Sequence, residues 1–103
     1  MRSEAEILES EVERHFNRQV KARDGWSLKF SVPGVRGLPD RLCFMPKGIL
    51  LLCELKRPKG GRYYAIQLYV HAKLEALGFP VHRAHTRGRV DLIFEEYDKR
   101  VQA

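Results

Sequence analysis

The stretch GLPDRLCFMPKGILLLCELK, residues 37–56, is the most informative part of the chain because two short apolar runs flank a turn in it. The runs cover residues 41–45 and 49–55, and a Pro-Lys-Gly turn at residues 46–48 separates them. Two strand-like runs joined by a short turn are typical of a β-hairpin. We therefore expect two neighbouring antiparallel strands here.

Polar residues stand at the open end of this hairpin. Glu54 and Lys56 are two positions apart, so a strand projects both from one face while Leu55 points into apolar packing. A turn at residues 46–48 pairs residues whose numbers sum to about 94, which brings Asp40 opposite the Glu54 end. We expect Asp40, Glu54 and Lys56 to meet at one end of the sheet.

This arrangement favours a divalent metal site. Two neighbouring carboxylates repel each other, and burying them without a counter-ion costs several kcal/mol. Magnesium prefers oxygen ligands and commonly uses one or two carboxylates. Lys56 beside such a metal could position or help deprotonate an attacking water. The alternative is that Asp40 caps a loop while Glu54 and Lys56 form an exposed cross-strand charge pair.

The rest of the chain predicts an α/β domain. Helical periodicity at residues 4–23 and 64–77, and strand-like patterns at 26–32 and 79–84, surround the hairpin. Loops are expected at residues 33–39 and 57–62, and residues 90–97 fit either a helix or a strand. The expected architecture is one mixed sheet flanked by helices.

Length and composition narrow the class of protein. A chain of 103 residues forms one domain, residues 1–103, and its charge of +6 favours a polyanionic partner. It contains no apolar stretch long enough to span a membrane, and charged residues at its start predict a cytoplasmic protein. Cys43 and Cys53 are expected to be buried, reduced thiols.

The hairpin motif resembles a known nuclease signature. Pro39-Asp40, followed by Glu54-Leu55-Lys56, matches the PD-(D/E)xK pattern. The wider setting resembles the VRR-NUC branch of that superfamily, whose small stand-alone members are typical of phages and prophages. The resemblance runs from about residue 9 to residue 90 and also includes Gln67 and the segment LGFPV at residues 77–81.

The resemblance implies a restriction-endonuclease-like α-β-β-β-α-β core and phosphodiester hydrolysis that depends on Mg²⁺ or Mn²⁺. Asp40 and Glu54 would bind the metal, and the backbone carbonyl of Leu55 would add a ligand. Lys56 would lie beside the attacking water. Gln67 matches a family glutamine near the active site, although a solvated helix position is the alternative.

The first helix of the family supplies another acidic residue. Glu9 fits the family pattern best, and Glu13 follows one turn later on the same helix face. Glu4 is a third candidate in another frame. We expect Glu9 to serve the metal, then Glu13, then Glu4.

Basic residues predict a surface that follows nucleic acid. We expect contacts to the phosphate backbone from loops beside the metal site, at Arg36, Arg41, Arg57, Lys59 and Arg62. The four histidines show no ligand spacing with a cysteine and are expected to be surface or partly buried residues. Trp26 and Phe30 are expected in the core.

Together these features predict a metal-dependent DNA endonuclease from a phage or prophage, active in the bacterial cytoplasm. The chain has little room for a base-reading module, so we expect it to recognise DNA structure such as a Holliday junction or flap, as a homodimer. The alternative is a non-catalytic basic nucleic-acid-binding adaptor that keeps the nuclease fold.

Overall fold

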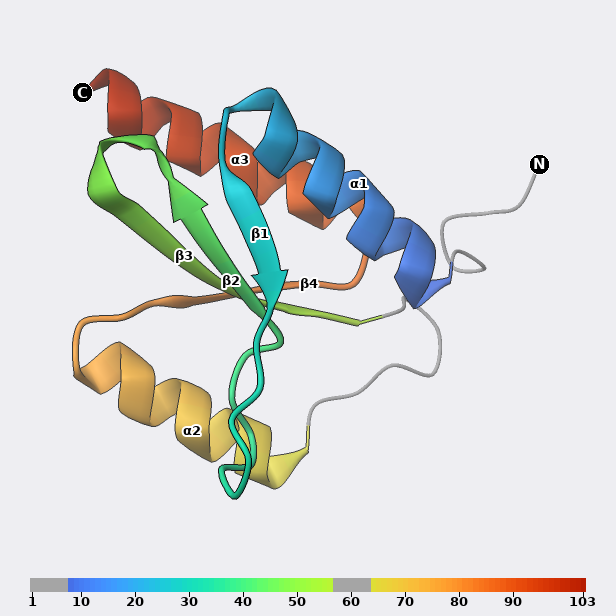
Figure 1. The fold of residues 1–103 in the computed structure, drawn as a ribbon, viewed down its shortest axis with the longest axis vertical. Helices are drawn as coiled ribbons and strands as arrows, with labels where there is room; N and C mark the ends of the chain where they lie inside the picture. The colour runs from blue at the N-terminus through green and yellow to red at the C-terminus, as the bar shows by residue number, and fades with distance from the viewer. Residues whose placement is uncertain (1–7, 57–63) are drawn as a thin grey trace.

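The computed structural model describes residues 8–56 and 64–103 (Figure 1). Its elements follow the expected α-β-β-β-α-β order and end in one further helix. They are α1 (Glu9–Ala22), β1 (Trp26–Lys29), β2 (Arg41–Met45), a 3₁₀ turn (Pro46–Gly48), β3 (Ile49–Leu55), α2 (Ala65–Ala76), β4 (Val81–Ala84) and α3 (Arg87–Gln102).

The four strands form one mixed sheet in the order β1-β2-β3-β4. Strands β1, β2 and β3 pair antiparallel, and β4 pairs parallel to β3. In the hairpin Arg41 pairs with Cys53 and Met45 pairs with Ile49, which confirms the register expected from the turn.

Helices α1 and α3 cover one face of the sheet and run beside each other (Figure 1). Their apolar faces meet the sheet in the main core, where the rings of Phe16 and Phe94 lie 5.4 Å apart. Residues recurring every three to four positions provide this contact, which is why the two segments are helical. The buried members on the helices are Val12, Phe16, Val20, Val90, Ile93, Phe94 and Tyr97.

The last segment of the chain is α3, which settles the choice left open for residues 90–97. Thr86 caps its start, because the Thr86 hydroxyl accepts a hydrogen bond from the backbone N–H of Arg89 at 3.0 Å. The guanidinium of Arg23 donates two hydrogen bonds of 2.8 Å to Asp98 and so ties α3 to the end of α1. These contacts stabilise the helical form.

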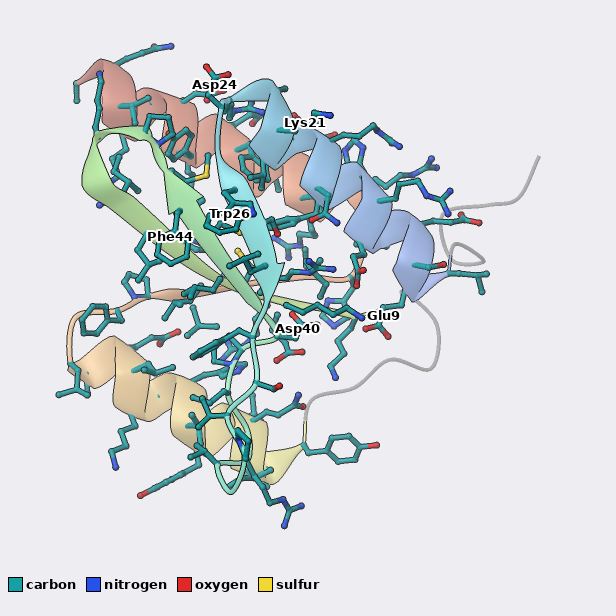
Figure 2. All side chains as sticks on the ribbon, viewed as in Figure 1. Glu9, Lys21, Asp24, Trp26, Asp40 and Phe44 are labelled. Carbon is teal, nitrogen blue, oxygen red and sulfur yellow. The ribbon has the colours of Figure 1, made fainter. Side chains whose placement is uncertain are left out.

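The opposite face of the sheet is covered by α2 near one end only (Figure 1). Trp26 is 64% exposed and packs against the half-exposed Phe44, with ring centroids 6.1 Å apart (Figure 2). The expectation that Trp26 belongs to the core was therefore wrong. Trp26 and Leu28 do lie on the same face of β1, as their spacing predicts. That face is the side of the sheet that α2 covers only in part.

The loop before β2 brings the chain close to α2. Gly37 has φ of +84°, and a Cβ at this position would lie 2.7 Å from the carbonyl oxygen of Ile66. Glycine is needed both for this backbone conformation and for the close approach. The buried Pro39 then leads directly to Asp40, the residue immediately before β2.

Two further features of the described residues are the state of the cysteines and the apolar character of the helices. Cys43 and Cys53 are both buried and free, as expected. Within residues 8–56 and 64–103 no helix has the length and apolar character needed to cross a membrane.

Candidate active site

The expected carboxylates meet at one end of the hairpin. Asp40 precedes the pair formed by Arg41 and Cys53, so it lies level with Glu54 on β3. Its Oδ1 accepts a hydrogen bond from the backbone N–H of Leu55 at 3.4 Å. The Lys56 Nζ lies 3.7 Å from the Glu54 Oε2, while the Leu55 side chain is fully buried in the core. The alternation of side chains along a strand therefore places Glu54 and Lys56 on one side and Leu55 on the other, as predicted.

Burial and neighbouring negative charges make both carboxylates difficult to ionise. Desolvation raises the pKa of Asp40 to about 6, although the Leu55 N–H and the charge of Arg41 oppose that rise. Desolvation, followed by the negative charge of Asp40, raises the pKa of Glu54 to about 7, against the opposing charge of Lys56. At neutral pH the site therefore holds two carboxyl groups whose charge is poorly compensated.

The donor set fits a hard divalent cation. Among the described residues no group of three histidine, cysteine, aspartate or glutamate side chains forms a ready metal site. Mg²⁺ needs only one or two carboxylates, because water and substrate oxygens complete its coordination. Glu54 Oε1 is buried without a hydrogen-bond partner, and an unsatisfied carboxylate oxygen beside a second carboxylate suits such an ion.

The candidates on the first helix differ in their surroundings. The charge of Glu9 raises the pKa of both Asp40 and Glu54. Figure 2 shows Glu9 and Asp40 at the same end of the sheet. The charge of Glu13 also raises the pKa of Asp40, but its carboxylate forms an ion pair with Arg41 Nη2 at 2.5 Å, and Glu4 lies outside the described residues. Of the described helix glutamates, Glu9 is the one whose charge acts on both carboxylates, and its role as a ligand remains a prediction.

Arg41 does not occupy the position expected of a DNA-binding loop residue. It is the first residue of β2, its side chain is only 7% exposed, and it pairs with Glu13. Because the buried Arg41 side chain forms an ion pair with Glu13, it joins β2 to α1 and has a structural role. Arg36 is exposed on the loop before Asp40, as expected, whereas Arg57, Lys59 and Arg62 lie outside the described residues.

Gln67 caps the start of α2. Its side-chain Oε1 accepts a hydrogen bond from the backbone N–H of Tyr64 at 2.9 Å. This contact satisfies a backbone donor that the helix itself leaves free. No hydrogen bond or ion pair of the described residues joins Gln67 to Asp40 or Glu54, so its catalytic role remains a prediction.

One residue at the site was missed by the sequence reasoning. His71 on α2 is fully buried, and its Nε2 lies 3.6 Å from Glu54 Oε1. Arg83 Nε donates a hydrogen bond to His71 Nδ1 at 3.1 Å. Desolvation, followed by the charge of Arg83, lowers the pKa of His71. The only sequence signal was its position one helical turn after Gln67.

The chain is similar to known proteins in sequence and in fold. No family model matches the chain. The chain is 41% identical over 75 residues to "Putative nuclease p44" of Acyrthosiphon pisum secondary endosymbiont phage 1, an alignment covering 73% of this chain and 80% of that protein. It is also similar to a solved structure named "VRR_NUC domain", with a TM-score of 0.80 and 24% identity, over 88% of this chain and 99% of that one.

Proposed function

This chain belongs to the VRR-NUC family of phage-type nucleases, and from that premise we propose that it is a metal-dependent endonuclease that hydrolyses phosphodiester bonds in DNA. The observation that carries the proposal is the pair formed by the partly buried Asp40 and the buried Glu54, whose pKa values rise to about 6 and about 7. A binding protein gains nothing from burying two such groups, whereas a metal site requires them.

We propose that Asp40 and Glu54 hold Mg²⁺ or Mn²⁺, with Glu9 and the backbone carbonyl of Leu55 as further ligands. When bound there, such an ion would supply Lewis-acid chemistry, lowering the pKa of a coordinated water and neutralising charge on the scissile phosphate. The Leu55 N–H supports this arrangement, because it donates to Asp40 Oδ1 and fixes that carboxylate toward β3.

Lys56 provides the positive group beside the carboxylates. Its ammonium lies 3.7 Å from Glu54 Oε2 on the same face of β3, and its side chain is 16% exposed. From this place it can hold the attacking water by a hydrogen bond and counter the charge that develops on the phosphate. Gln67, at the start of α2, is proposed as a further contact to the reacting groups through its amide.

DNA is the proposed substrate, and branched DNA such as a Holliday junction or flap is the proposed form. A net charge of +6 favours a polyanion, and Arg36, Arg57, Lys59 and Arg62 are proposed to contact phosphates. Phosphate contacts carry no direct sequence information, which favours recognition of DNA shape. We propose that two copies act as a homodimer in the bacterial cytoplasm, since a two-fold axis relates two cuts at a junction.

The experiment is cleavage of labelled four-way junction, flap, single-stranded and duplex DNA with Mg²⁺ or Mn²⁺, with and without EDTA. Lys56→Ala is the test variant. Lys47→Ala is the matched control, because Lys47 lies in the turn at the opposite end of the hairpin. Cutting that requires metal and Lys56, but not Lys47, supports the proposal. Retained DNA binding without cutting of any substrate would instead favour the non-catalytic adaptor.

A further inference from the structure

His71 is the buried residue of α2, while most of the other residues of that twelve-residue helix are exposed. Burying an imidazole removes two ring nitrogens from water, so each needs a partner in the protein. The two partners of His71 lie next to each other in the sheet, since Glu54 and Arg83 are paired in the parallel register of β3 and β4.

The hydrogen bond from Arg83 determines which ring nitrogen of His71 carries the proton. A guanidinium Nε always bears a hydrogen, and it donates to His71 Nδ1 at 3.1 Å. Nδ1 is therefore the acceptor, and the proton of the neutral ring is on Nε2. This Nε2 lies 3.6 Å from Glu54 Oε1, and both atoms are buried with no hydrogen-bond partner.

We propose that His71 is a positioning residue for Glu54: held in one tautomer by Arg83, it directs its Nε2–H at Oε1 and orients the carboxylate toward the divalent cation. The inference rests on the proposed function, because it assumes that Glu54 is a metal ligand. The separation of 3.6 Å exceeds a hydrogen bond, and a movement of about 0.5 Å closes it.

Lys56 completes the restraint on Glu54. Its Nζ approaches Oε2 at 3.7 Å, while His71 approaches Oε1, so a donor faces each oxygen of the carboxylate. Donors on both oxygens limit rotation of the carboxylate about its last bond. Hydrogen-bonding partners that orient a ligating carboxylate typically contribute about 10- to 100-fold to metal affinity.

The test is the affinity for Mn²⁺, measured by titration calorimetry at one pH on the whole chain. We expect His71→Leu to weaken binding by about 10- to 100-fold. His71→Gln keeps an N–H donor facing Glu54, so its affinity should return to within about threefold of the wild type. Wild-type affinity in a folded His71→Leu variant would overturn the inference.

His82→Leu is the matched control. His82 neighbours Arg83 in β4 but lies on the other side of the strand, where the charges of Glu96 and Arg100 act on it. We expect its Mn²⁺ affinity to equal that of the wild type. A purely structural His71 would instead give variants that melt at lower temperature with unchanged Mn²⁺ affinity, which also overturns the inference.

Two measurements keep the inference testable if His71→Leu does not fold. Nitrogen NMR of the wild type should place the His71 proton on Nε2, and a proton on Nδ1 would overturn the proposal. Arg83→Met should mix the two tautomers and weaken Mn²⁺ binding. A wild type that binds no Mn²⁺ refutes the proposed function and this inference together, whereas binding that is indifferent to His71 refutes the inference alone.

Discussion

Glu54→Gln should stabilise the metal-free protein at pH 8. Burial and the charge of Asp40 raise the pKa of Glu54 from 4.5 to about 7, so the folded chain holds this proton more tightly than the unfolded chain. The protonated Glu54 therefore stabilises the folded state. This contribution to the free energy of unfolding is fully present below pH 4.5 and is lost as the pH rises through about 7. At 1.36 kcal/mol per pKa unit, the ionised Glu54 costs about 3 kcal/mol.

The variant recovers only part of this free energy, because Lys56 loses its charged partner at 3.7 Å. We expect a gain of about 2 kcal/mol at pH 8 and little difference from the wild type at pH 5. The assay is urea denaturation in EDTA at both pH values. Comparison of the two proteins is essential, because the lowered pKa values of His71, His82 and His85 give the opposite pH dependence in both.

Metal provides the second half of this test. Mg²⁺ should raise the denaturation midpoint of the wild type at pH 8, because it binds the folded state and relieves the repulsion between Asp40 and Glu54. It should leave Glu54→Gln nearly unchanged. A variant that is no more stable than the wild type at pH 8, with a difference independent of pH, would show that the charge of Glu54 does not destabilise the folded protein.

Three further variants test the positions around the site. Gly37→Ala should lower stability by about 2 kcal/mol in thermal unfolding, because its Cβ would lie 2.7 Å from the Ile66 carbonyl at φ of +84°; an unchanged melting temperature would contradict this close approach. Glu13→Gln should destabilise the fold by about 2 kcal/mol in urea, since it leaves Arg41 buried without its partner; a neutral effect would mean that water replaces Glu13. Glu9→Gln should weaken Mn²⁺ binding about tenfold by calorimetry, and equal affinity would remove Glu9 from the ligand set.

The hairpin and its carboxylates were predictable because local rules govern them. Alternation along a strand places Glu54 and Lys56 on one face and Leu55 on the other, and the turn at residues 46–48 sets the register. Pairing of Arg41 with Cys53 confirms that register. No long-range information was needed to bring Asp40 beside Glu54.

Contacts between distant elements were not predictable in the same way. Trp26 alternates as a core residue would, but its exposure depends on how much of the sheet α2 covers. Arg41 reads as a basic loop residue until Glu13 is found beside it on α1. The role of His71 depends on the pairing of Glu54 with Arg83 in the sheet, which brings both residues next to its ring.

The most direct measurement is the anomalous difference map of a crystal of this protein soaked in Mn²⁺. We expect one peak between Asp40 and Glu54, at about 2.0 to 2.3 Å from an oxygen of each carboxylate, with the Glu9 side chain turned toward it. A strong peak elsewhere, or an empty map in a protein that cleaves DNA with Mn²⁺, would contradict the assignment of these carboxylates as the metal site.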